Sequence, residues 1–78
     1  MGMKEKSAFA VKIGQEIRRR RRDDCKRSQE DFADDCGIAR AYMGVIERGE
    51  AVISVEMAKR IVSGLGTTLG EFFTKVGE

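Results

Sequence analysis

The segment from Ser28 to Gly49 limits the possible folds of this 78-residue chain more than any other stretch. Its pattern predicts two short helices separated by Gly37, a residue that readily takes the left-handed conformation in which many helices end. Ser28 is a suitable N-cap for the first helix, with Asp31 three residues later. The side chains expected to face inward are Phe32, Ala33 and Cys36. Ile38 follows the turn directly, so we expect it to fill the angle between two closely packed helices.

The second of these helices, predicted over about residues 40–48, presents different side chains on its two faces. Met43 and Ile46 have the spacing of a core-facing stripe. The positions left on the outside are Arg40, Ala41, Gly44 and Val45, with Tyr42 at the margin. Two helices at a steep angle form a helix-turn-helix, whose second helix can enter the major groove of DNA. The segment therefore favours a DNA-binding function over an enzymatic one.

Three further helices are predicted, and no stretch alternates with period two, so the expected fold class is all-α with five helices. The first spans about residues 7–23 and is followed by a loop at 25–27. The residues of its inner face are Phe9, Ile13 and Ile17. The expected N-caps of the three helices are Ser7, Ser54 and Thr68, the last with Glu71 in a capping box. Gly64 and Gly66 are expected to end the fourth helix.

A chain of this length corresponds to one domain, so we expect residues 1–78 to form a single unit. The helix-turn-helix would occupy about residues 28–48, and residues 1–6 would be disordered. No run approaches the roughly 18 apolar residues that read as a membrane span. The first twelve residues lack the apolar core and cleavage site of a signal peptide, so we expect a cytoplasmic protein.

The net charge of +2 is unevenly distributed. Residues 1–27 contain ten Lys and Arg against four Asp and Glu, whereas residues 28–78 contain five against nine. The basic density peaks in a run of five arginines, residues 18–22. Such a cluster favours a polyanion as partner, and a solvated helix face is the alternative. Because five consecutive helical residues point in every direction, some of these arginines must face away from any one partner.

The composition argues against catalytic and metal-dependent functions. The chain has no His, and Cys25 and Cys36 are its only cysteines, which excludes the usual Cys/His metal sites. The adjacent carboxylates at 23–24 and 34–35 point in different directions on a helix rather than converging. We therefore expect no enzyme activity, no cofactor and no metal. Both thiols are expected to be free, with Cys36 in the core, and a disulfide redox switch is the alternative.

The last predicted helix carries more apolar residues than one short helix can bury. These residues are Leu69, Phe72, Phe73 and Val76. Some of them would meet a second subunit, because exposed apolar patches mark protein contacts. The alternative for any one of them is that it closes the core of its own chain.

Over about residues 9–73 the chain resembles the lambda-repressor-like, or Xre-type, helix-turn-helix family. The residues that carry the resemblance are Ile13-Gly14, Ile17-Arg18, Ser28-Gln29-Glu30-Asp31-Phe32-Ala33, Gly37-Ile38, Tyr42-Met43, Ile46-Glu47-Arg48-Gly49 and, in the tail, Leu65-Gly66, Leu69 and Glu71-Phe72. The short chain and the loop after Gly49 are similar to controller proteins of restriction–modification systems. Phage Cro-like repressors and antitoxins are near alternatives.

The resemblance implies five helices and a homodimer on a two-fold DNA operator, and it assigns roles to individual positions. Gln29 would hold a DNA phosphate, and Tyr42 and Arg48 would flank the DNA backbone. The positions implied to face the DNA groove are Arg40, Ala41 and Gly44, and Ala39 and Val45 complete the expected DNA-facing set. Glu47 would be structural and pair with Arg21, and Gly37 and Ile38 would shape the turn.

Several residues depart from the family pattern. Ala39 stands where the family usually has a Ser or Thr cap, and Arg20 replaces a usual Leu. Arg27 replaces an apolar residue, and Ile53 stands where many relatives carry Pro. The link between the first two helices is one residue longer than usual. These departures concern the end of the first helix and its DNA contacts, and they leave the central motif intact.

Arg40 is the strongest hydrogen-bond donor on the outer face of the predicted recognition helix, and arginine binds guanine O6 and N7 in a bidentate contact. Ala41 would touch a thymine methyl group, and DNA shape would supply the remaining specificity. A symmetric dimer predicts a palindromic operator with half-sites about 10 base pairs apart. The alternative function is a protein-interaction module that binds a toxin or an RNA polymerase subunit through the apolar last helix.

Overall fold

The computed structural model describes residues 7–78 and contains five α-helices and one short π-helical segment in that range. The elements are α1 (Ala8–Arg19), η1 (Arg20–Asp24), α2 (Gln29–Cys36), α3 (Arg40–Glu47), α4 (Val55–Leu65) and α5 (Leu69–Gly77). The described residues contain no β-strand, which confirms the all-α class. The expected disorder of residues 1–6 concerns residues outside this range.

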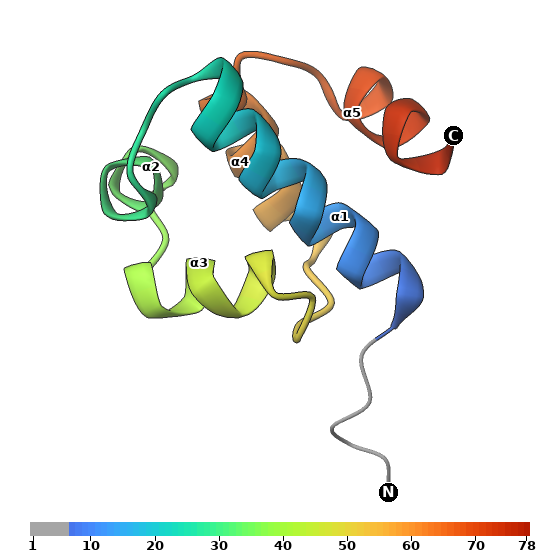
Figure 1. Cartoon of the computed structure of the whole chain (residues 1–78), viewed down its shortest axis with the longest axis horizontal. Coiled ribbons are helices and arrows are strands. Elements are labelled where there is room, and N and C mark those ends of the chain that lie inside the picture. The colour runs from blue at the N-terminus through green and yellow to red at the C-terminus, as the bar shows by residue number, and fades with distance from the viewer. Residues whose placement is uncertain (1–6) are drawn as a thin grey trace, which may run out of the picture.

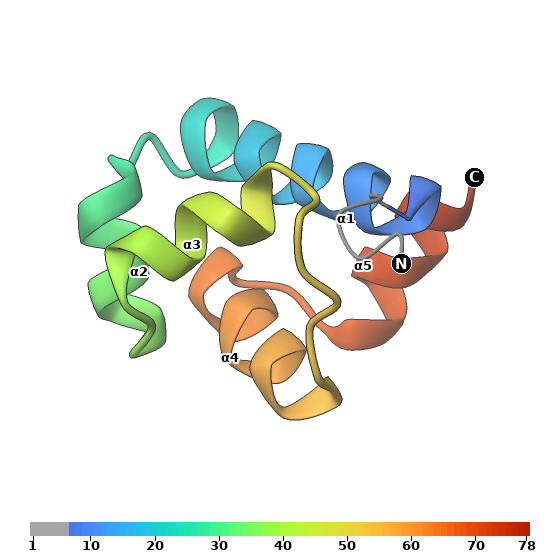
Figure 2. The same cartoon turned by 90° about the horizontal axis from the view of Figure 1, so that it is seen from below.

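The five helices surround one apolar core (Figure 1). The long α1 packs against α3 on one side and α5 on the other, while α2 and α4 also pack together (Figure 2). The largest fully buried side chains are Phe32, Phe72, Ile17, Met43, Ile46 and Ile61. Each of the five helices therefore contributes at least one fully buried side chain to the core.

Local sequence signals define most helix ends. In each of the four expected N-caps, the side-chain oxygen accepts a hydrogen bond from the backbone N–H three residues later, with N···O distances of 3.1–3.2 Å. These caps are Ser7, Ser28, Ser54 and Thr68. Gly37 and Gly66 end α2 and α4 in the left-handed conformation, with φ of 70° and 77°. Gly64, expected to help end α4, instead lies within it. A Cβ there would come within 2.9 Å of the Cys36 sulfur, so this glycine permits close packing.

The first helix does not remain an α-helix up to Asp23 as predicted. The α-helical part ends at Arg19, and the chain continues as the π-helical segment η1 to Asp24. The N–H of Cys25 donates to the carbonyl of Arg20 at 2.8 Å, five residues back. Since a π-turn holds one residue more than an α-turn, η1 accommodates the extra residue expected in this link.

Two expectations about apolar residues are corrected. Phe9 was predicted to face the core, but it is 49% exposed because α1 begins at the edge of the molecule. Phe72 and Val76 were predicted to meet a second subunit, but they are 1% and 5% exposed. Both pack into the core of their own chain, so they are closed to a partner. Leu69 and Phe73 are only partly buried.

Among residues 7–78, no helix combines the length and apolar character needed to cross a membrane.

Candidate nucleic-acid interface

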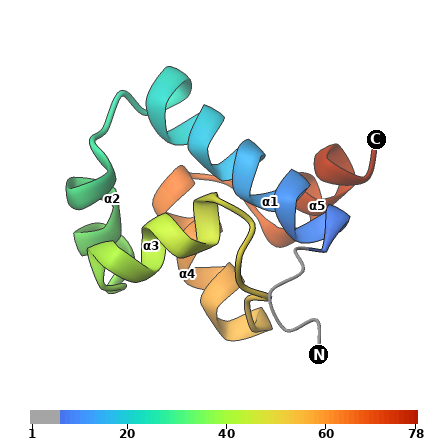
Figure 3. The ribbon, with the colours of Figure 1, turned by 60° about the horizontal axis from the view of Figure 1, so that its bottom comes forward.

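The predicted recognition helix, α3, begins on the surface and ends against the core. Arg40, Ala41 and Tyr42 are exposed, whereas Val45 is partly buried and Met43 is fully buried. Ala39 is exposed at the N-cap position, and its side chain makes no capping bond, as the departure from the family pattern implied. The outer face near the start of α3 is therefore exposed to solvent, and Figure 3 shows how α3 runs from this end to the loop that leads to α4.

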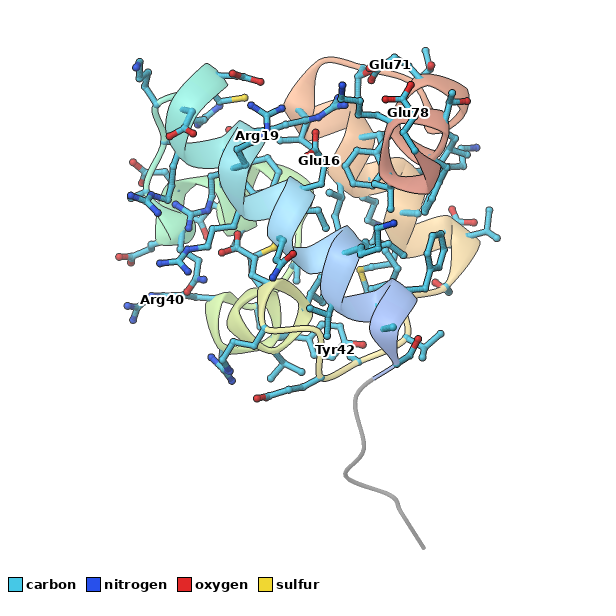
Figure 4. The ribbon with its side chains drawn as sticks, turned by 45° about the vertical axis from the view of Figure 1, so that its right-hand side comes forward. Glu16, Arg19, Arg40, Tyr42, Glu71 and Glu78 are labelled. Carbon is cyan, nitrogen blue, oxygen red and sulfur yellow. The ribbon has the colours of Figure 1, made fainter. Side chains whose placement is uncertain are left out.

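Arg40 is the cation best placed on this face. Its side chain extends away from the body of the protein (Figure 4), and it forms no ion pair with any residue in the described range. Tyr42 lies on the same helix and is 38% exposed. Arg40 therefore gives the exposed part of α3 a strong hydrogen-bond donor, and Tyr42, two residues on, gives it a partly exposed aromatic side chain that points in another direction.

Three of the expected DNA-contacting residues, Gln29, Gly44 and Arg48, meet at one point. Gly44 was expected to face outward, but it is buried. A Cβ at Gly44 would lie 3.1 Å from Arg48 Nη1 and 3.5 Å from Gln29 Oε1, so these two polar side chains cover it. Gly44 thus provides space for the ends of Gln29, which is partly buried, and of Arg48, which is exposed.

A buried ion pair fixes Gln29 at the start of α2. Arg21 Nε and Nη2 donate to the two carboxylate oxygens of Glu47 at 2.8 and 3.0 Å, which gives the paired geometry typical of strong charge-assisted bonds. Arg21 also donates to the carbonyl of Arg27 at 2.9 Å. Gln29 Nε2 donates to Glu47 Oε1 at 3.0 Å. The predicted pairing of Arg21 with Glu47 is therefore present, and it also holds the amide of Gln29.

Arg48, the C-cap of α3, pairs with Glu50 through Nε at 3.2 Å. Both side chains remain largely exposed, so this pair is open to solvent. Exposed ion pairs of this kind contribute little to stability and are screened by salt. The remaining donors of the Arg48 guanidinium stay available for a phosphate.

The arginine run divides into free and paired members. Arg18 and Arg22 are exposed and form no ion pair with a described residue, whereas Arg19, Arg20 and Arg21 each bind a carboxylate. In Figure 4, Glu16, Arg19 and Glu71 lie in the upper part of the view, apart from Arg40 at its left edge and Tyr42 near its bottom. Part of the run therefore stabilises the fold, and only part remains for a polyanion.

Arg20 is the clearest case that sequence reasoning missed. It is buried and bridges Glu16 of α1 and Glu71 of α5. Its hydrogen bonds, together with one from the Thr67 hydroxyl, lower the pKa of Glu71 to about 2. The only sequence signal was that an arginine stands where the family usually has leucine, and its partner lies 51 residues away.

Neither thiol forms a disulfide bond. Cys25 and Cys36 are both free, and Cys36 is buried in the core as expected. Burial raises the pKa of the Cys36 thiol to about 11, with a smaller contribution from the neighbouring Asp35. A protonated, buried thiol is a poor nucleophile, which weighs against the redox alternative. The described residues contain no cluster of His, Cys, Asp or Glu able to hold a metal ion.

An apolar groove of about 350 Å³ lies beyond the C-terminal end of α3. Its walls come from the start of α1, the loop after α3, the start of α4, and α5. The side chains at its rim are Phe9, Val52, Val55, Leu69 and Phe73. Val52 and Val55 are 83% and 71% exposed. Leu69 and Phe73 were expected at a protein contact and Phe9 in the core, whereas no role was predicted for Val52, in the loop after α3, or for Val55, the first residue of α4.

Residues 17–72 match the helix-turn-helix family, a range that includes all of α2 and α3. The chain belongs to the helix-turn-helix family. Among curated proteins, control protein C.MunI from a Mycoplasma species is 32% identical over 66 residues, which cover 85% of this chain and 89% of that protein.

Solved structures of restriction–modification controller proteins have the same helix-turn-helix fold. C.AhdI from Aeromonas hydrophila superposes with a TM-score of 0.79 at 33% identity, covering 86% of this chain and 100% of that one. C.Esp1396I, solved as a tetramer with its natural 35 base-pair operator, superposes with a TM-score of 0.80 at 26% identity, covering 90% and 91%. This helix-turn-helix protein is therefore homologous to restriction–modification controller proteins, which are regulators rather than enzymes.

Proposed function

We propose that this protein is a transcription regulator of the controller type that binds double-stranded DNA as a homodimer in the cytoplasm and has no enzyme activity. The observation that carries the proposal is the exposed face of α3, where Arg40 forms no ion pair with a described residue and where Gln29 and Arg48 meet over Gly44, four residues further along the chain. The homologous C.Esp1396I was solved on its operator, which supports DNA as the ligand.

Direct reading of the sequence would come mainly from Arg40. It lies in the first turn of α3, which is the part of a recognition helix that reaches the base edges. A bidentate contact from Arg40 to guanine fits its free guanidinium, and Ala41 offers a methyl group to thymine. Ala39 and the partly buried Val45 add only apolar contact, so DNA shape must supply further specificity.

Contacts to the DNA backbone would come from both sides of α3. Gln29 is the first residue of α2, where backbone N–H groups and the helix dipole favour a phosphate. One amide hydrogen of Gln29 is used by Glu47, and the other is left to donate to that phosphate. Arg48 and Tyr42 would bind the backbone at the other side.

The apolar groove supplies the dimer contact in this proposal. Leu69 and Phe73 keep their expected role, Phe72 and Val76 lose it, and Phe9, Val52 and Val55 join the contact. The loop that leaves α3 forms one wall of the groove, so the two-fold axis lies near the C-terminal end of each α3. Arg40, at the N-terminal end, would then contact the outer part of each half-site.

The test is fluorescence anisotropy with DNA from immediately upstream of this protein's own gene and with scrambled DNA, over a salt series. We expect tighter binding to the upstream DNA that persists at raised salt. Arg40→Ala should cost about 1–3 kcal/mol on that DNA and change little on scrambled DNA. Lys59→Ala, at an exposed position of α4, is the matched control.

Equal losses on both DNAs would assign Arg40 to phosphate binding instead. No binding to either DNA at low salt would contradict the proposal and favour the protein-interaction alternative. That alternative has lost much of its basis, because Phe72 and Val76 are buried within their own chain.

A further inference from the structure

Arg20 takes no part in the proposed DNA interface, because its guanidinium is turned toward α5. Nε donates to Glu16 Oε2 at 2.6 Å, and Nη1 and Nη2 donate to the two oxygens of Glu71 at 2.7 and 3.2 Å. The same guanidinium lies 5.2 Å from the centre of the Phe72 ring. Two carboxylates and an aromatic face thus hold one buried arginine, which orients the first turn of α5 against the end of α1.

A continuous series of ring contacts leads from Arg20 to the apolar groove. Phe72, beneath Arg20, meets Phe73 edge to face with ring centres 5.2 Å apart. Phe73 in turn lies 6.4 Å from the ring of Phe9 across the groove. Glu71 lies between Leu69 and Phe73, the two residues of α5 that line the groove. The placement of these two side chains therefore depends on how Arg20 holds α5.

We propose that Arg20 is a positioning residue for self-association. By holding α5 in place, it positions the wall of the groove to which a second copy of this chain binds. The inference rests on the proposed function, which places the dimer contact in this groove. A forked pair fixes the rotation of α5 about its axis, whereas the Leu usual in the family would hold it only by apolar contact. Without the pair, Phe72 and Val76 still anchor α5 to the core, but its first turn can tilt.

The test is sedimentation equilibrium of the full chain without DNA. We expect Arg20→Leu and Glu71→Gln to remain helical by circular dichroism while their dimer dissociation constants rise at least tenfold. Arg20→Lys keeps the positive charge but loses the forked hydrogen bonds to Glu71. Its dimer dissociation constant should lie between those of these two variants and that of the wild type. Glu78→Gln is the matched control, because among residues 7–78 the carboxylate of Glu78, the C-cap of α5, pairs only with Lys75, and this variant should associate like the wild type.

A second measurement separates positioning from simple stabilisation. In dilute monomer, the nuclear Overhauser contacts between the Phe9 and Phe73 rings should weaken in Glu71→Gln. If Arg20→Leu fails to fold, Glu71→Gln decides the matter, since the Glu71 side chain is 53% exposed and its loss leaves the core unchanged.

The outcomes distinguish this inference from the proposed function. A lower unfolding temperature with an unchanged dissociation constant and unchanged ring contacts would overturn the role of Arg20 and leave the dimer intact. A wild-type protein that stays monomeric at all concentrations, with and without DNA, would overturn the proposed homodimer itself.

Discussion

At the scale of single residues, Gly14 allows a close approach of α1 to the backbone at the end of α3. A Cβ at this position would lie 2.5 Å from the carbonyl oxygen of Ile46 and 2.6 Å from that of Glu47. These are backbone atoms at the end of α3, so they cannot move aside as a flexible side chain would. Gly14 therefore lets α1 approach α3 closely enough for Arg21 to reach Glu47.

Gly14→Ala should force α1 and α3 apart and destabilise the protein by about 1–3 kcal/mol, the usual cost of overpacking a core. Gly70→Ala is the control, because a Cβ there meets nothing within 4 Å and alanine is the better helix former. Urea unfolding of both variants measures the difference. Equal stability of the two would show that the α1–α3 contact relaxes without cost.

The Arg21–Glu47 pair should show different effects on stability and on binding. Arg21→Met leaves Glu47 buried without its counter-charge, which should cost about 3–5 kcal/mol. Adding Glu47→Leu removes the stranded charge and should restore much of the stability measured by urea unfolding. Operator affinity should stay low in the double variant, because Gln29 has lost the oxygen that holds its amide. Wild-type affinity in the double variant would show that Glu47 does not position Gln29.

At the scale of helices, the sequence predicted features that depend on neighbouring residues, such as helix caps. It did not predict some of the contacts between residues far apart in the chain. Ser28 and Thr68 cap their helices as predicted, because a cap needs only N–H groups two or three residues ahead. The pairing of Arg20 with Glu71 depends on how α1 and α5 pack, so the arginine run alone could not reveal it. The same holds for the groove, where Phe9 meets Phe73 from the other end of the chain.

The contact between α1 and α5 should depend on pH. The hydrogen bonds from Arg20, then that from the Thr67 hydroxyl, with nearby Lys75, lower the pKa of Glu71 from 4.5 to about 2. Because the folded-state pKa lies below the ordinary value, the ionised pair stabilises the fold above about pH 4.5 and loses this contribution as the pH falls to 2.

Thermal unfolding of the wild type and Glu71→Gln checks this. The wild type should be more stable at neutral pH, and the difference between the two should shrink as the pH falls from 4.5 to 2. Glu16, whose pKa is also lowered, by Arg19 first and also by Arg20, is present in both proteins. A constant difference across this range would mean that Glu71 is not held as a carboxylate by Arg20.

At the scale of the whole molecule, the two proposed surfaces meet at the loop between α3 and α4. Arg40 lies at one end of α3, and the loop that follows the other end carries Val52 into the groove. A dimer formed through the groove therefore fixes the distance between two recognition helices rigidly. The expected separation is about 34 Å, which is one turn of DNA.

This rigid spacing predicts how the operator tolerates insertions. Five added base pairs between the half-sites turn them to opposite faces of the DNA, and ten restore the face but double the distance of roughly 34 Å. Both insertions should therefore reduce the operator affinity measured by fluorescence anisotropy to that of a single half-site. Substitutions in the same spacer should have smaller effects on this affinity, because they act only through DNA bending. Binding that is insensitive to spacing would mean that two monomers occupy the half-sites independently. Recovery at ten base pairs alone would mean that the subunits are joined flexibly, which a contact through Phe9, Val52 and Phe73 does not allow.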